Sequence, residues 1–210
     1  MSAKIYGPNG TELEIGALNK AARVELYHSN GSPVYPVAPV GKYGMRIEII
    51  PTNLTINNVQ WTIFNPVGNA TIVGLDRIQL QSGFIGTTAA SISYFRFEKF
   101  SAATTFTGGI VSPAAKFKIT YPVSNIICNQ LPAGLTPPTP APVFEQYFHE
   151  HAVRNSTSLS DTVGIEIAGG GAEDELLYLE PGTGLAITAD SALVLGAVLV
   201  GSVYWHEYAI

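Results

Sequence analysis

Short runs in which polar and apolar residues alternate constrain the fold of this chain more than any other feature. Arg46-Ile47-Glu48-Ile49-Ile50 is one such run, and Lys116-Phe117-Lys118-Ile119-Thr120-Tyr121 is another. Alternation with a period of two indicates a β-strand that buries one face. About ten such strands, with turns roughly every ten residues, are typical of a β-sandwich or a β-barrel. The sequence therefore predicts an all-β fold.

Turn residues place the ends of several of these strands. Asn30-Gly31 predicts a tight hairpin, because both residues accept positive φ angles. Asn65-Pro66 ends the strand predicted over 59–64. Residues 70–80 predict one strand, or two strands with a bulge at Gly74. The other expected strands are 23–27, 91–97, 143–153, 162–168, 176–179, 185–188 and 193–205, the last apolar on both faces and therefore central. Residues 143–153 could also form a short helix, but their aromatic side chains favour the strand.

Residues 131–142 hold five prolines among twelve residues, which favours an extended polyproline path without hydrogen bonds. The stretch suits either an interdomain linker or a strap or long crossover inside one β domain. We favour the strap or crossover, because composition does not change across it. The predicted organisation is an N-terminal arm over 1–20 and a β-sandwich over 21–210 with a proline-rich crossover at 131–142.

Alternation also predicts which side chains fill the core of the sandwich. The expected core residues are Val24, Leu26, Ile47, Ile49, Trp61, Ile63, Ile78, Leu80, Phe117, Ile119, Ile165, Ile167, Leu177, Leu179, Leu195, Val198, Val200 and Val203.

Charged side chains are scarce. They make up 13 % of the residues, about half the usual share of about 25 %, and the net charge is −5. Because charged groups resist desolvation, a surface poor in them tolerates burial against other proteins. We expect an obligate or near-obligate oligomer, the alternative being a weakly charged monomer. The lack of a basic run argues against nucleic-acid binding.

Membrane insertion and secretion are not expected. The longest apolar stretch, 191–204, is shorter than the about 20 residues that a membrane helix needs. The segment Met1–Tyr6 lacks the apolar core of a signal peptide.

Two groups of side chains invite a chemical interpretation. His149 and His151 lie two residues apart, so a strand would place both on one face, with Glu145 as a possible third metal ligand. A third ligand at recognisable spacing is missing, so we expect a polar strand face at a subunit contact and no metal. Cys128 follows two isoleucines and cannot form an internal disulfide, which predicts a buried, inert thiol.

Other motifs give no support for catalysis or a cofactor. Gly169-Gly170-Gly171 precedes acidic residues and not the Lys-Ser or Lys-Thr of a phosphate loop. The acidic cluster Glu173-Asp174-Glu175 lacks calcium-loop spacing and predicts a solvated turn. The hydrolase motif Gly-x-Ser-x-Gly is absent, and residues 82–86, in which Ser82 precedes two glycines, have no base nearby. Trp61 and Trp205 suit a β core or a subunit seam better than a sugar platform.

Several strand-and-turn phrases resemble small virion proteins of tailed bacteriophages, most strongly toward the C-terminal end. These phrases are Arg23-Val24-Glu25-Leu26-Tyr27 with Asn30-Gly31, Ile63 to Asn69, Val73 to Ile78, Tyr178 to Ile187, and Val203-Tyr204-Trp205. The resemblance implies a jelly-roll-like antiparallel β-sandwich with terminal arms that cements or decorates a capsid, typically as a trimer. It supplies no catalytic residues.

We therefore expect a virion structural protein without enzymatic activity or cofactor, assembled in the host cytoplasm. Its expected partners are copies of itself, as a homotrimer, and the major capsid protein. The alternative is a receptor- or glycan-binding module of a tail or fibre, which an exposed aromatic platform would favour.

Overall fold

The computed structural model divides the chain into two compact units, Met1–Ala38 and Pro39–Ile210. It describes residues 3–6, 12–15, 26–27, 33–34, 39–50, 58–84, 92–131, 134–145, 149–154, 163–168, 177–189 and 197–210.

The first unit contains two short antiparallel pairs. Strand β1 (Ala3–Tyr6) pairs with β2 (Glu12–Ile15), and β3 (Leu26–Tyr27) pairs with β4 (Pro33–Val34). The second pair flanks Asn30-Gly31, so the predicted hairpin pairing is confirmed. The predicted boundary between residues 20 and 21 lies outside the described residues and stays a prediction.

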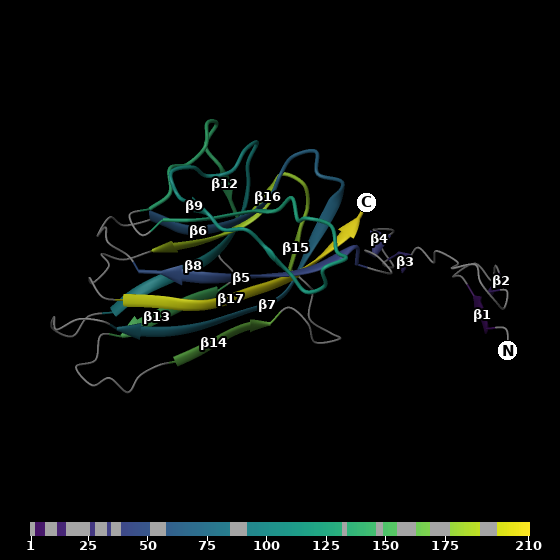
Figure 1. The fold of residues 1–210 in the computed structure, drawn as a ribbon, viewed down its shortest axis with the longest axis horizontal. Coiled ribbons are helices and arrows are strands. Elements are labelled where there is room, and N and C mark those ends of the chain that lie inside the picture. Colours follow the sequence, from purple (N-terminus) through teal and green to yellow (C-terminus); the bar gives the residue numbers. More distant parts are fainter. Residues whose placement is uncertain are drawn as a thin grey trace. The chain divides into compact units, whose positions relative to one another are not determined.

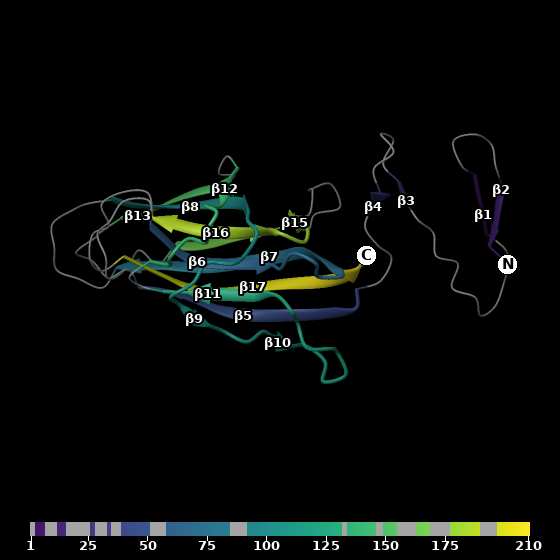
Figure 2. The same ribbon diagram turned by 90° about the horizontal axis from the view of Figure 1, so that it is seen from above.

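The second unit is a sandwich of two antiparallel sheets (Figures 1 and 2). The first sheet has the order β10 (Ala115–Lys116), β5 (Gly41–Ile49), β17 (Ala197–Ala209), β7 (Thr71–Phe84) and β14 (Val163–Ala168), and β15 (Leu177–Leu179) also pairs with β7. The second sheet has the order β12 (Val143–Phe144), β8 (Ile92–Ser101), β16 (Thr183–Ala189), β6 (Asn58–Asn65), β11 (Ile127–Gln130) and β9 (Ile110–Val111), and β13 (His149–Arg154) also pairs with β8. The predicted all-β antiparallel sandwich is confirmed.

The strand pairs of the sandwich are nested along the chain. Strands β5, β6, β7 and β8 follow one another, and they pair with β17, β16, β14 and β13 respectively. The pairs alternate between the two sheets.

Nine of the thirteen expected core residues whose side chains the structure describes are buried between the sheets. The confirmed core residues are Ile47, Ile49, Trp61, Ile63, Ile78, Leu80, Leu179, Val198 and Val203. Leu177 and Val200 are half-buried. Val24, Leu26, Ile165, Ile167 and Leu195 are residues whose side chains the structure does not describe.

The predicted strand over 116–121 is wrong. Pairing of β10 with β5 ends at Lys116, and a turn follows in which the Tyr121 N–H donates to Lys118 O at 3.1 Å. Phe117 and Ile119 are 54 % and 91 % exposed, so neither belongs to the core. Alternation predicted a strand with one buried face here, but the described chain forms an exposed turn after Lys116.

Three further expectations are refined. The bulge in β7 lies at Asp76 and not at Gly74, because Leu75 and Arg77 oppose successive residues of β17. Residues 143–153 hold two strands, β12 and β13. The described part of the proline-rich stretch connects β11 with β12 of the same sheet. Its Leu135 N–H donates to Val59 O at 2.7 Å, so this path is not free of hydrogen bonds.

The turn between β15 and β16 has the predicted type II form. The Thr183 N–H donates to Glu180 O at 3.0 Å, and Gly182 has a φ of 86°. Strand β17 is central, between β5 and β7, as its apolar sequence predicted. Among the described residues there is no α-helix, and hence no helix long and apolar enough to cross a membrane.

Candidate functional site

The outer face of the first sheet carries the most distinctive group of polar and aromatic side chains. Along β17 the side chains alternate, so Val203, Trp205 and Glu207 point into the sandwich and Tyr204 and His206 point outward. Along β5, Tyr43 is likewise buried in the core. The outward-facing residues of the two strands therefore lie side by side.

A shallow groove of about 360 Å³ lies on this face. It is lined by Gly44, Met45, Arg46, Ala115, Lys116, Phe117, Ser202 and Tyr204. The rings of Phe117 and Tyr204 meet edge to face, with centroids 5.9 Å apart. A Cβ at Gly44 would lie 2.9 Å from Tyr204 Cδ1 and 3.2 Å from Phe117 Cε2, so glycine is what lets both rings lie against β5.

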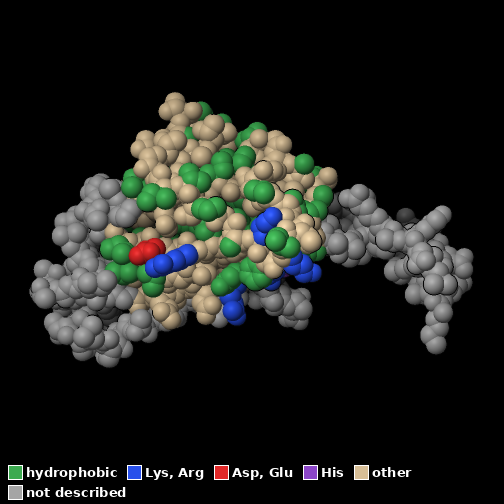
Figure 3. All heavy atoms as spheres, viewed as in Figure 1, with side chains coloured by type: hydrophobic (Ala, Val, Ile, Leu, Met, Phe, Trp, Pro, Cys, Tyr) green, Lys and Arg blue, Asp and Glu red, His purple; other side chains and the backbone are tan. Residues whose placement is uncertain are grey.

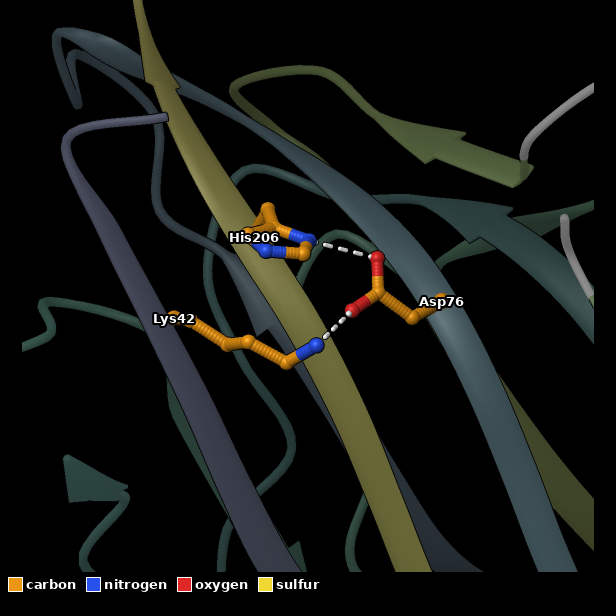
Figure 4. Close-up of polar contacts among 3 residues, drawn as sticks. All are labelled: Lys42, Asp76 and His206. Atoms are coloured by element: carbon orange, nitrogen blue, oxygen red, sulfur yellow. Dashed lines mark hydrogen bonds and ion pairs between the residues drawn. The ribbon is translucent and has the colours of Figure 1, made fainter. Parts of the chain in front are cut away.

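Next to the groove, Asp76 joins three strands (Figure 4). Its Oδ1 lies 2.6 Å from Nδ1 of His206 on β17, and its Oδ2 lies 3.2 Å from Nζ of Lys42 on β5. Asp76 is the extra residue of the β7 bulge, which turns its side chain toward β17 and β5. The network holds a carboxylate, an imidazole and an ammonium group but no hydroxyl or thiol. It can orient His206 and fix the three strands, and it supplies no nucleophile.

A second polar group lies directly beneath, inside the sandwich. Glu207 is only 3 % exposed and accepts hydrogen bonds from the Ser124 hydroxyl and from Nε1 of Trp205, the latter at 3.2 Å. Burial raises the pKa of the Glu207 carboxyl, and the two hydrogen bonds partly oppose that shift. Burial, with the charge of Glu207, raises the pKa of Tyr43 to about 12, so its hydroxyl stays protonated and donates to Pro122 O at 3.1 Å.

Cys128 lies in the same interior. It is 1 % exposed, and burial together with the charge of Glu207 raises the pKa of its thiol. The predicted buried thiol is confirmed, and protonation makes it a poor nucleophile. Trp61 and Trp205 are both fully buried, so they fill the core and offer no sugar platform.

Residues 110–123, which we call the edge segment, run along one edge of the sandwich from β9 past β10 (Figure 2). Unlike most loops, this segment exposes large apolar side chains. These are Ile110, Val111, Phe117, Ile119 and Val123, of which Ile119 and Val123 are 91 % and 79 % exposed. Hydrophobic side chains are also spread over the face shown in Figure 3, where the visible charged groups are few.

The predicted histidine pair lies elsewhere, on β13. In the pairing of β13 with β8, His149 lies opposite Phe97 and His151 lies opposite Phe95. The ring centroids of His149 and Phe97 are 5.3 Å apart. Burial lowers the pKa of both imidazoles, and the charge of His149 lowers that of His151 further. In the described part of the chain, no three His, Cys, Asp or Glu side chains gather as a metal site. Glu145 lies just beyond β12.

The remaining motifs fall largely outside the described residues. The acidic cluster 173–175 and the glycines 169–171 are not described, and neither are residues 85 and 86 of the serine-containing stretch. The expectations for these segments stay predictions.

Comparisons with protein-family models, with curated proteins and with solved structures found no match for this chain. Its function is therefore argued from its own residues.

Sequence reasoning missed the contact between Asp76 and His206, which are 130 positions apart. One signal was present: Tyr204, His206 and Tyr208 occupy every second position near the end of the last strand. That pattern indicates a polar and aromatic outer face, but it does not reveal which strand lies beside it.

Proposed function

We propose that this chain is a virion structural protein of a tailed bacteriophage that cements or decorates the capsid through contacts between subunits. In this proposal it acts as a homotrimer, binds the major capsid protein and has no enzymatic activity. The observation that carries the proposal is the edge segment, whose large apolar side chains are exposed although the core residue Tyr43 anchors the segment by a hydrogen bond to Pro122 O. Exposed apolar groups in such a cluster mark protein interfaces.

The order of the strands supports the proposal. A jelly roll is a long antiparallel ribbon folded into two sheets, and viral capsid and lectin domains often have this form. The nested pairs β5–β17, β6–β16, β7–β14 and β8–β13 follow the order expected for such a ribbon. We therefore include a jelly-roll topology in the proposal.

The composition supports it as well. A particle made of many copies buries much of each subunit, and burying an unpaired charge is costly. With 13 % charged residues the chain has few such groups to desolvate. Interfaces of ordinary size bury about 1,600 Å², and many equivalent contacts on a capsid add avidity.

Two measurements test the proposal. Native mass spectrometry of the full chain should give a trimer, and co-sedimentation with empty capsids of the phage that encodes it should recover the protein in the pellet. A stable monomer that stays in the supernatant would contradict the proposal.

A second candidate function is recognition of a host receptor or glycan by a tail or fibre module. The groove beside Phe117 and Tyr204 favours it, because sugars stack on exposed aromatic rings. Isothermal titration calorimetry against a panel of host surface glycans separates the two functions. Heat of binding that disappears in Tyr204→Ala, without any capsid binding by the wild type, would favour the receptor-binding function.

A further inference from the structure

The edge segment is positively charged on a protein that is negative overall. Residues 101–142 contain Lys116 and Lys118 but no aspartate or glutamate. On the neighbouring strand β5, Lys42 pairs with Asp76 and Arg46 pairs with Glu48. These four basic and two acidic side chains give the surface a formal charge of +2. Because the whole chain carries −5, all its other residues together carry −7.

The conformation of this surface is fixed before any partner binds. The Lys116 ammonium donates to Tyr121 O at 3.0 Å and to Ile119 O at 3.3 Å, which closes the turn beneath the exposed Ile119 side chain. The Phe117 N–H donates to Lys42 O at 3.1 Å. The hydroxyl of the buried Tyr43 donates a hydrogen bond to Pro122 O at 3.1 Å. A rigid surface loses little conformational entropy on binding, which favours its use as a contact.

Charge determines which surface can cover the edge segment. Two edge segments brought face to face repel each other, because both are positive. The remainder of any second copy is negative and attracts it. A twofold, isologous contact through this surface is thus disfavoured, whereas a head-to-tail, heterologous contact is favoured.

We propose that the edge segment of one copy binds an acidic surface outside the edge segment of a second copy, head to tail. This inference rests on the self-association in the proposed function and specifies its geometry. Ile119 and Val123 supply the apolar contact, and Lys118 supplies the charge. Heterologous contacts close into rings when the rotation between copies divides a full turn, and a trimer is one such ring.

The test uses the full chain and two matched variants. Ile119→Asp with Lys118→Glu removes both the apolar and the positive contact, whereas Ile119→Val with Lys118→Arg keeps both. All the altered side chains are exposed, so far-ultraviolet circular dichroism and urea midpoints should match the wild type. Sedimentation equilibrium should show a dissociation constant at least about tenfold higher for the first variant. The second variant should stay within about threefold of the wild type.

Mixing distinguishes the two geometries. A tagged Ile119→Asp, Lys118→Glu chain still offers its acidic surface, so native mass spectrometry should detect a mixed dimer with the wild type. Absence of mixed species, with an intact wild-type oligomer, overturns the head-to-tail geometry. If the dissociation constant of the first variant is unchanged, the edge segment is not part of the interface between copies. That result would overturn this inference but would not contradict the proposed function. A wild type that is monomeric and ignores capsids overturns both.

Discussion

Nδ1 of His206 lies 2.6 Å from Oδ1 of Asp76, and the carboxylate reaches His206 because it projects from a bulge in the neighbouring strand. Lys42 binds the other oxygen of the same carboxylate at 3.2 Å. One partly buried acid thereby ties together β5, β17 and β7, the three central strands of the first sheet.

We expect Asp76→Ala to lower the free energy of unfolding by about 1.5–3 kcal/mol, since hydrogen bonds to charged groups contribute on that scale. Glu48→Ala removes the same charge from the exposed Arg46–Glu48 pair, whose side chains are 73 % and 40 % exposed. We expect this control substitution to lower the free energy of unfolding by only about 0–1 kcal/mol. Urea unfolding of both variants at neutral pH checks the difference, and equal losses would show that the Asp76 network has no special role.

We expect the buried carboxyl of Glu207 to make the free energy of unfolding depend on pH. Burial raises the pKa of its carboxyl above the ordinary value of 4.5, so the folded state binds the proton more tightly than the unfolded state. The contribution of Glu207 is therefore greatest below pH 4.5 and decreases as the pH rises through the pKa of the folded state. Glu207→Gln keeps the shape and removes this decrease.

Urea unfolding between pH 4 and pH 8 measures this effect. The stability of Glu207→Gln relative to the wild type should increase with pH and then level off. Curves that stay parallel over the whole range would mean that the carboxyl titrates alike in the folded and unfolded states.

Gly201 on β17 should tolerate no side chain. A Cβ there would lie 2.0 Å from Gln79 O, a backbone atom of β7 that cannot move without breaking the pairing of the two strands. We expect Gly201→Ala to lower the free energy of unfolding by about 3 kcal/mol or more. Gly74→Ala is the matched control, because its Cβ would meet two side-chain rings, Tyr208 at 3.0 Å and Tyr178 at 3.3 Å, and no backbone atom that is as close. Thermal unfolding should give Gly201→Ala a much lower melting temperature than Gly74→Ala. The reverse order would contradict the close packing of β17 against β7.

Cys128 should react with a thiol reagent only when the chain unfolds. Its side chain is buried, so a reagent cannot reach the sulfur atom in the folded state. The raised pKa of the thiol also keeps the reactive thiolate form scarce. Labelling with a disulfide reagent at pH 8 should be complete within seconds in concentrated urea and should be slower by orders of magnitude without it. Rapid labelling of the folded protein would place the thiol at the surface.

The alternating pattern predicted the sandwich well where a strand has neighbours on both sides. Ile47, Ile63 and Val203 are buried as their periodicity indicated, because each belongs to a central strand. The same pattern failed at Phe117 and Ile119, where pairing with β5 stops after two residues. Periodicity reports which side chains share a face, but it does not report whether another layer covers that face.

The candidate site was less predictable for a related reason. The Asp76 network depends on a bulge, and the bulge depends on the register between β7 and β17, which are far apart in the sequence. No local motif specifies such a register. The strand pairing that flanks Asn30-Gly31 and the turn at Pro181-Gly182 were predictable because each depends on residues that are close together in the sequence.

The position of β17 has a consequence for biosynthesis. It is synthesised after β16, yet it lies between β5 and β7, which precede it by many strands along the chain. A nascent chain can pair β5 with β10, and β7 with β14 and β15, before β17 is made, but it cannot join β5 to β7 through a shared neighbour until β17 has emerged from the ribosome. The first sheet is therefore completed only after β17 is synthesised, and chaperones that shield unpaired strands during elongation are expected to raise the yield of this protein.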